Sequence, residues 1–354
     1  MDLKELGFND WFEERADTSR PADHRIARIV SRHRDSYSLH DGTSEITAEI
    51  TGRLAHSAES PLDYPTVGDW VYAQYFDDGA FAVIHGILPR KSILKRKTAG
   101  RRIEYQPIAA NVDTAFLIQS LETPVRLASL ERYLVMSNEA RIRPLVLLSK
   151  SDLVPDDRIG ELLERVREGL PGVEVTTFSN LETEGPDRIG ARLRPGETFC
   201  LLGPSGVGKT TLLNRLVGEA AFDTQPVRKG SGKGRHTTTR RQLVRVRGGA
   251  LAIDTPGMRE LGQMGAESGL EQTFDEIAVL AEQCRYSDCT HTREAGCAIL
   301  AALEEEEIAE DRYRSYLKLV REISRNDMSY QEKRRHDRQF GKFQKSVMKH
   351  NLKK

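Results

Sequence analysis

The sequence has no net charge, no long apolar run and few cysteines, and each absence excludes a class of protein. Its 354 residues carry 53 lysines and arginines against 53 aspartates and glutamates, so overall basicity does not indicate a nucleic-acid partner. No apolar run approaches the length that spans a membrane, and the acidic N-terminus lacks the apolar core of a signal peptide. We therefore expect a cytoplasmic protein of two or three domains with no membrane partner.

The chain has only four cysteines, which excludes a disulfide framework and is typical of a reducing compartment. Three of them lie with one histidine in the pattern C-x4-C-x-H-x5-C: Cys284, Cys289, His291 and Cys297. Three thiolates and one imidazole fill a tetrahedral Zn²⁺ site and leave no position for water. The alternative is a set of reduced cysteines beside an unrelated histidine. We predict one structural zinc ion that stabilises a small helical domain.

The most specific motif is GPSGVGKT at 203–210, which fits the pattern G-x-x-x-x-G-K-[ST]. A short apolar segment at 197–203 precedes it, and helical apolar spacing at 210–218 follows it. Strand, glycine-rich turn and helix form a cradle whose backbone N–H groups bind phosphate, whereas the alternative is an ordinary turn between strand and helix. The pattern predicts a nucleoside triphosphate site. Its residues are Gly203, Pro204, Ser205, Gly206, Val207, Gly208, Lys209, Thr210 and Thr211.

Two further motifs complete the chemistry of a triphosphate site. Lys209 would bind the β- and γ-phosphates, and Thr210 would bind Mg²⁺. DTPG at 254–257 follows an apolar segment, so Asp254 would hold the water shell of Mg²⁺ and the Gly257 N–H would reach the γ-phosphate. A run of threonines lies between the two phosphate motifs, and we predict that Thr238 completes the Mg²⁺ shell. The alternative for this run is a polar loop with no role.

A guanine-specific site needs a carboxylate that pairs with the N1 and N2 hydrogens, a donor pair that adenine lacks. The usual motif is N-K-x-D after a buried strand, and no such motif follows DTPG. Before the phosphate loop, however, a predicted strand at 142–149 ends in Ser149, Lys150, Ser151 and Asp152. Serine in place of asparagine departs from the motif and puts one guanine contact in doubt. Asp152, which selects guanine over adenine, is present.

The sequence FSN at 178–180 stands where a second base-contacting loop would fall, so Ser179 and Asn180 are further candidates. Along the chain the base-reading motif comes first, the phosphate loop second and the metal-binding DTPG turn last. This order is a cyclic permutation of the usual order of GTPase motifs. A sheet can still form in this order if the original termini lie close together.

The region before these motifs has a different residue pattern, with short β-rich segments in place of alternating strands and helices. Five short β-rich segments separated by turn signals lie between residues 24 and 89, and they predict a small closed barrel of the OB type. A β-domain without a ligand is the alternative. The segment 89–102 carries seven basic residues and no acidic one. It fits a solvated linker as well as a rim of the barrel that contacts the phosphates of single-stranded nucleic acid. From residue 103 strands and helices alternate, with helices predicted at 127–140 and 156–169.

With these motifs the chain resembles the ribosome small-subunit-dependent GTPase A family over roughly residues 22–354. The phosphate loop, GRHTTT at 234–239, DTPG and the cysteine cluster all match the family pattern. The resemblance implies a multidomain α/β protein with an N-terminal OB-fold barrel, a circularly permuted P-loop GTPase domain and a C-terminal helical zinc-binding domain. We place these at 22–96, 97–262 and 263–354, after a leader over 1–21.

The resemblance also implies a function: a GTPase that binds the small ribosomal subunit and its rRNA late in assembly and is released on GTP hydrolysis. Met258 stands where many GTPases carry a water-orienting glutamine, so slow intrinsic turnover is expected. We predict that His236, in a glycine-rich loop, orients the water once a partner orders that loop. The basic tail after residue 330, with Phe340 and Phe343 interleaved, fits rRNA contact, although a frayed tail is the alternative.

Two other functions remain open to the sequence. One is a P-loop ATPase or kinase that acts on a small molecule. The other is a zinc-bearing rRNA-binding module that uses guanine nucleotide as a ligand without turnover. We expect a monomer, although no residue pattern determines the oligomeric state.

Overall fold

The structure is a computed structural model of the 354-residue chain, and it describes residues 2–34, 36–97, 104–182, 184–218, 241–254 and 266–327. Three predicted site residues and the basic tail lie outside the described residues: His236, Thr238, Gly257 and residues 328–354. None of the helices in the described ranges is both long enough and apolar enough to cross a membrane.

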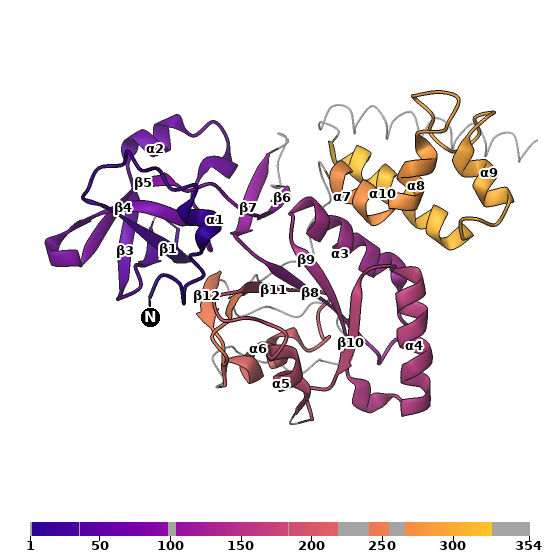
Figure 1. The fold of residues 1–354 in the computed structure, drawn as a ribbon, viewed down its shortest axis with the longest axis horizontal. Coiled ribbons are helices and arrows are strands. Elements are labelled where there is room, and N and C mark those ends of the chain that lie inside the picture. The colour runs from indigo at the N-terminus through magenta and orange to yellow at the C-terminus, as the bar shows by residue number, and fades with distance from the viewer. Residues whose placement is uncertain are drawn as a thin grey trace, which may run out of the picture.

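The N-terminal part forms a closed five-stranded barrel (Figure 1). Its strands are β1 (His24–Arg32), β2 (Tyr37–His40), β3 (Glu45–Ile50), β4 (Trp70–Phe76) and β5 (Phe81–Ile87). β1 pairs with both β2 and β4, and a parallel pairing of β3 with β5 closes the ring. The predicted OB-type barrel is therefore confirmed. The third strand ends at Ile50, because the next side chain, that of Thr51, caps α2 (Gly52–Ser57) by accepting the Leu54 N–H.

The predicted leader packs against the barrel. It contains α1 (Asp10–Glu13), and its residues Leu6 and Phe12 are buried in a cluster with Trp70 and Leu88. The Phe8 ring meets the Trp70 indole edge to face at 5.0 Å, a favourable arrangement of two aromatic rings. The leader thus forms part of a hydrophobic core.

The basic segment after the barrel contains β6 (Ile93–Lys97), which pairs with β7 (Tyr105–Ala110). One of its arginines has a structural partner: the Arg90 guanidinium donates to both carboxylate oxygens of Asp69, each at 2.8 Å. The Asp69 side chain is fully buried and that of Arg90 is 16% exposed. A buried carboxylate needs a paired charge, so Arg90 is engaged in a structural ion pair with Asp69. Its guanidinium is therefore not available to bind a phosphate.

The central domain is built on a mainly parallel sheet. Its strands are β8 (Thr114–Ser120), β9 (Arg143–Ser149), β10 (Glu174–Phe178), β11 (Thr198–Leu202), β12 (Gln242–Arg245) and β13 (Leu251–Asp254). They lie in the order β10-β9-β8-β11-β13-β12, and only β12 runs antiparallel. The helices of this domain are α3 (Leu127–Glu139), α4 (Asp156–Gly169), α5 (Glu184–Gly190) and α6 (Lys209–Val217). The strands β8 and β9 are buried along nearly their whole length, as their continuous apolar sequences predict.

A buried arginine joins the barrel to this sheet. Arg28 of β1 is 1% exposed, and its guanidinium donates to the Thr198 hydroxyl of β11 at 2.9 Å. It also donates to the carbonyl oxygens of Leu6, Gly68 and Asn111. Burial lowers the pKa of Arg28 to about 10, against the opposing effect of Asp113 and Asp69. Leader, barrel and phosphate-loop strand therefore meet at one side chain.

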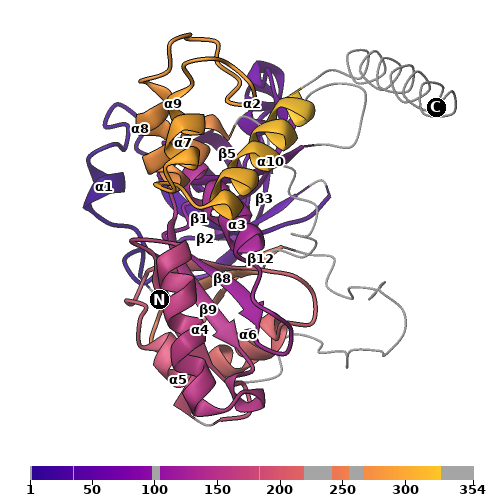
Figure 2. The same cartoon turned by 90° about the vertical axis from the view of Figure 1, so that its right-hand side faces the viewer.

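The C-terminal helices α7 (Glu267–Thr273), α8 (Asp275–Ala281), α9 (Ala298–Glu304) and α10 (Glu310–Asp327) form a small unit with its own apolar core. Figures 1 and 2 both show this unit beside α3 and away from α5 and α6. A Cβ at Gly269 would lie 2.2 Å from the Val135 carbonyl oxygen, so only glycine permits this approach of α7 to α3. Arg312 of α10 donates at 3.0 Å to Glu131 of α3, which is 3% exposed, so a buried ion pair fixes the contact.

Candidate nucleotide site and metal cluster

The predicted nucleotide-binding loops meet at one edge of the parallel sheet. β8, β9, β10, β11 and β13 run in the same direction, so their carboxyl ends lie together. The base-reading motif follows β9, the FSN loop follows β10, the phosphate loop follows β11, and Asp254 ends β13. The cyclic permutation changes the order of these loops along the chain without changing the edge at which they meet.

The phosphate loop needs glycine at its two ends. Gly203 has φ +153°, and a Cβ there would lie 2.3 Å from the Ile118 carbonyl oxygen. Gly208 has φ +93° and precedes the first residue of α6. The Lys209 ammonium donates to the carbonyl oxygens of Gly203 and Pro204, at 2.8 and 2.6 Å, and so points into the loop. Of the remaining predicted residues, Ser205 and Gly206 are exposed in the loop, Val207 is buried beneath it, and Thr210 and Thr211 are exposed in the first turn of α6.

Ser149, the residue that departs from the base-reading motif, makes a defined contact. Its side chain is fully buried, and its hydroxyl donates to the Val207 carbonyl oxygen of the phosphate loop at 2.8 Å. The same hydroxyl lies 3.3 Å from the Gln119 carbonyl oxygen at the end of β8. Serine therefore ties the base-reading strand to the phosphate loop through the backbone.

The two predicted base-contacting loops are also joined to each other and to the phosphate loop. Asp152 lies in a 3₁₀ turn, Ser151–Leu153, and accepts a short hydrogen bond from the Ser179 hydroxyl. Asn180 donates to the Gly208 carbonyl oxygen at 3.1 Å. Lys150 has the left-handed φ of +62° and pairs with Glu122, a partner that the motif does not specify. Asp152 and Lys209 thus belong to one set of interlocked loops.

Asp254 lies at the same edge, with its carboxyl mostly buried. Burial raises the pKa of Asp254 to about 6, against the lowering effect of the Lys209 ammonium. Lys209 and Asp254 therefore interact electrostatically, as expected of two groups that share a phosphate and metal site. Burial makes this carboxyl costly to ionise, and a nearby cation offsets that cost. The raised pKa therefore fits the predicted role of Asp254 toward Mg²⁺.

Cys284, Cys289, His291 and Cys297 form one cluster, with all ligand atoms within 4.8 Å of one another. The Cys284 and Cys297 sulfurs are 3.9 Å apart, and they lie 3.5 and 3.6 Å from the His291 Nδ1. Tetrahedral Zn²⁺ with ordinary Zn–S and Zn–N bonds requires about 3.8 Å between sulfurs and about 3.6 Å between sulfur and nitrogen. The predicted cluster is thus confirmed as a group that could hold a metal, and the separations among Cys284, Cys297 and His291 are those of a tetrahedral Zn²⁺ site.

The chain around the cluster favours anionic sulfur at Cys284. Burial acts to raise the pKa of this thiol, but the N–H groups of Ala298 and Ile299 and the Cys297 thiol oppose it, and the net pKa is lowered. The Tyr313 hydroxyl donates to the His291 carbonyl oxygen at 2.7 Å, which ties the ligand loop to α10. His291 itself has φ +57°, so the loop is held in a conformation that non-glycine residues rarely adopt.

The predicted phosphate loop, the predicted base-reading strand and Asp254 lie at one edge of a permuted sheet, which is the arrangement of a circularly permuted P-loop GTPase. The family model described as RsgA GTPase matches residues 87–264. The chain is 41% identical to the small ribosomal subunit biogenesis GTPase RsgA of Opitutus terrae over 332 residues, which cover 91% of this chain and 90% of that protein. It is 45% identical to the protein of the same name from Streptomyces coelicolor over 266 residues, which cover 75% and 72%. The chain belongs to the RsgA GTPase family.

Solved structures agree with this assignment. YjeQ from Thermotoga maritima matches with a TM-score of 0.62 at 26% identity, over 85% of this chain and 98% of that chain. YloQ, described as a circularly permuted GTPase, matches with a TM-score of 0.59 at 24% identity, over 89% and 100%. The second match supports the fold alone.

Proposed function

We propose that the protein hydrolyses GTP with Mg²⁺, acts in the biogenesis of the small ribosomal subunit, and is stimulated by that subunit. The observation that carries the proposal is the set of contacts that joins the two base-contacting loops to each other and to the phosphate loop: Ser149 to Val207, Ser179 to Asp152, and Asn180 to Gly208. The names of the curated relatives support the process, and this process would place the protein in the cytoplasm with rRNA as a partner.

In this proposal each group at the edge has one task. Lys209 binds the β- and γ-phosphates. Thr210 would bind Mg²⁺ and Asp254 would hold its water shell, and the ion would neutralise charge that develops on the phosphates. Asp152 pairs with the guanine N1 and N2 hydrogens and is positioned by Ser179, while Asn180 joins the second base-contacting loop to the phosphate loop at Gly208. Water then attacks the γ-phosphorus in line, the bond to the β–γ bridging oxygen breaks to release GDP, and the water proton ends on the released phosphate. His236, Thr238 and Gly257 remain predicted participants outside the described residues.

The Cys₃His cluster would hold one structural Zn²⁺ ion. Its four protein ligands leave no open position, so the ion would stabilise the C-terminal helices and take no part in hydrolysis.

A comparison of GTP and ATP turnover, with and without small ribosomal subunits, tests the proposal. We expect turnover of GTP only, and faster turnover when subunits are added. Equal use of ATP would instead indicate a kinase or ATPase, and nucleotide binding without stimulated turnover would indicate an rRNA-binding module.

The variant Asp152→Asn tests whether Asp152 selects the guanine base. Asparagine at this position should weaken GTP binding by about tenfold or more, because a buried donor on guanine loses its acceptor, and should improve binding of xanthosine triphosphate. Asp157→Asn, an exposed acid-to-amide change on α4, is the matched control and should leave both affinities unchanged. An unaltered preference in Asp152→Asn would remove this motif from the site.

A further inference from the structure

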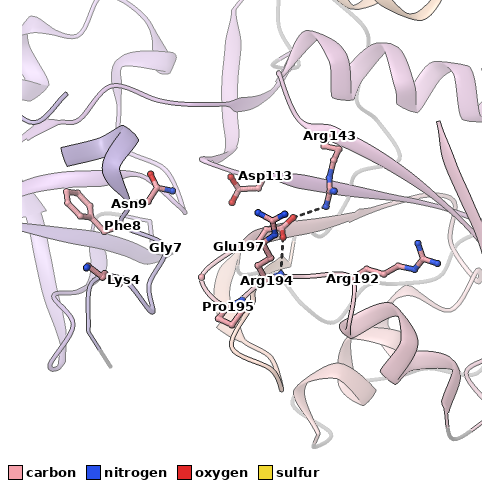
Figure 3. Close-up of a pocket in the computed structure, with 11 residues that line it drawn as sticks. Lys4, Gly7, Phe8, Asn9, Asp113, Arg143, Arg192, Arg194, Pro195 and Glu197 are labelled. Atoms are coloured by element: carbon pink, nitrogen blue, oxygen red, sulfur yellow. Dashed lines mark hydrogen bonds and ion pairs between the residues drawn. The ribbon is translucent and has the colours of Figure 1, made fainter. Parts of the chain in front are cut away.

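A second candidate binding site lies at the opposite edge of the sheet, where the parallel strands begin. A groove of about 430 Å³, here called the basal groove, separates the leader from this edge (Figure 3). Figure 3 shows Lys4 and Asn9 of the leader on one side and Arg143, Arg194 and Glu197 on the other. β8 has seven residues, so the groove is roughly 20 Å from the phosphate loop.

The two sides of the groove are held in fixed positions. Gly7 and Gly196 both have positive φ, and a Cβ at Gly7 would lie 2.6 Å from the Gly196 carbonyl oxygen. The buried Arg28 guanidinium bonds the Leu6 carbonyl oxygen and the Thr198 hydroxyl, and so fastens the leader to the start of β11. The groove is therefore a feature of the folded chain, with walls from two segments far apart in sequence.

The lining of the groove has an excess of positive charge. Four cationic side chains, Lys4, Arg143, Arg192 and Arg194, face two carboxylates, Asp113 and Glu197. These cations come together because Arg143 begins β9 beside the first residue of β8, while Arg192 and Arg194 lie in the turn before β11. The charge is thus a product of strand register.

Both carboxylates already have partners. Asp113 accepts from the Lys91 ammonium at 2.7 Å and from the Thr198 N–H at 2.9 Å. Glu197 accepts from the Thr114 hydroxyl at 2.5 Å, from Arg143 at 3.1 Å and from the backbone N–H of Arg194 at 3.0 Å. Their negative charge is therefore offset within the fold.

Two of the four cations have no such partner among the residues that the structure describes. Arg192 pairs with Glu174, and Arg143 pairs with Glu197. By contrast, the side chains of Lys4 and Arg194 make no hydrogen bond or ion pair to any residue that the structure describes. An anion in the groove would supply the missing counter-charge, from the leader on one side and the central domain on the other.

We propose that the basal groove binds a phosphate group, with Lys4 and Arg194 as its main ligands and Arg143 as a third. The excess of two positive charges matches one phosphate monoester, which carries about −1.5 to −2 at neutral pH, or two adjacent diester phosphates of RNA, which carry one negative charge each. A guanidinium recognises phosphate oxygens in a bidentate manner, and the groove volume falls in the range of small-molecule sites. The phosphate belongs either to a free phosphorylated compound or to an RNA backbone.

The test uses full-length protein loaded with a non-hydrolysable GTP analogue and Mg²⁺, so that the phosphate loop is filled. Inorganic phosphate is titrated by NMR at low salt, and small-subunit affinity is measured separately. We expect Arg194→Glu and Lys4→Glu to weaken one of these two interactions at least tenfold, and the effect to shrink as salt is raised. Arg158→Glu, an exposed charge reversal on α4, is the matched control and should change neither interaction more than twofold.

The outcomes separate the possible sources. Loss of inorganic phosphate binding indicates a free phosphorylated ligand, and loss of subunit affinity alone indicates RNA phosphates. The proposal is overturned if wild-type protein binds neither probe through these residues, or if Arg158→Glu has the same effect as Arg194→Glu.

The inference rests on the proposed function only because the GTP analogue is used to fill the phosphate loop. Basal GTP turnover of Arg194→Glu should match wild type, since this residue lies outside the nucleotide site. Should wild-type protein fail to take up the analogue, the proposed function falls, and the same phosphate titration then reports on the groove directly.

Discussion

The metal cluster and the nucleotide site are built in opposite ways. The four metal-ligating residues lie between Cys284 and Cys297, so short loops alone bring them together. The nucleotide site draws on residues from Gln119 to Asp254, and the parallel sheet brings them to one edge. Spacing along the chain therefore predicts the first site, whereas the second requires knowledge of which strands are neighbours.

The two sites also differ in what they stabilise. Cys297 is buried in the core of the C-terminal helices, so the cluster is part of a small hydrophobic unit. The nucleotide loops lie on a large sheet whose two core clusters come mostly from its strands and helices, with Val207 as the buried residue of the phosphate loop. Loss of the metal should therefore disrupt one unit, and loss of nucleotide should leave the sheet intact.

The largest effect is expected from removal of a metal ligand. Cys297→Ala should abolish metal binding and release the C-terminal helices, because structural zinc contributes on the order of 10 kcal/mol or more to such units. Hydrogen exchange should show lost protection in α8 and α9 and retained protection in α4 to α6. GTP affinity should change only a few-fold.

Cys200→Ala provides the matched control, since Cys200 is equally buried but lies in β11 away from the cluster. It should keep its metal content and the protection of the C-terminal helices. A Cys297→Ala protein that retains both would show that the cluster does not hold a structural ion.

An intermediate effect is expected at Asp254, through pH. The pKa of this carboxyl rises from 3.8 in the unfolded chain to about 6 in the fold, so the folded protein holds its proton more tightly. Between these two pKa values the free energy of unfolding falls as pH rises. Above pH 6 the ionised carboxylate lowers the free energy of unfolding by about 3 kcal/mol. Asp254→Asn should therefore stabilise the nucleotide-free protein at pH 8 and have little effect near pH 4.

The same substitution should have the opposite effect on function. In the presence of Mg²⁺ and GTP the variant should bind less tightly and lose turnover, because a neutral amide holds the water shell of Mg²⁺ less strongly than a carboxylate does. Urea unfolding at both pH values, with and without Mg²⁺–GTP, measures the two effects. If the stability of wild type and variant differs equally at pH 4 and pH 8, the raised pKa does not govern the site.

The smallest effect is expected at Ser149. Ser149→Ala removes the hydrogen bond to the Val207 carbonyl oxygen of the phosphate loop. We expect the free energy of GTP binding to weaken by about 1 kcal/mol, which corresponds to about fivefold lower affinity. Ser137→Ala is a close control: its hydroxyl is also fully buried and donates at 2.8 Å to a carbonyl, that of Tyr133, but within α3. Equal GTP affinities in the two variants would show that the Ser149 contact does not support the phosphate loop.

Sequence patterns located most elements of the central domain. The predicted helix at 156–169 coincides with α4, and the strand predicted at 142–149 coincides with β9 to within one residue. They did not identify β6, because its lysines and arginines resemble a linker. In the structure Lys95 lies over the Tyr105 ring and pairs with Glu139, partners that only the fold supplies.

Partners distant in sequence were likewise beyond prediction. Nothing in the leader indicates that its Leu6 carbonyl accepts from Arg28, or that Arg28 reaches Thr198 at the start of the phosphate-loop strand. The nearest signal is an arginine among the apolar residues of β1, where a buried charge requires several acceptors. Such acceptors come from the backbone of other segments, and no residue pattern specifies them.

The sequence by itself determined which residues are predicted to bind phosphate and metal, because phosphate and metal ligation demand particular side chains at short, fixed spacings. Only the tertiary structure decided how those residues meet: parallel strands carry Asp152, Lys209 and Asp254 to one edge despite their permuted order. It also decided that Ser149 bonds the phosphate loop and that a cationic groove forms at the other edge. Both follow from strand register, which depends on the packing of the whole sheet and is not contained in any local motif.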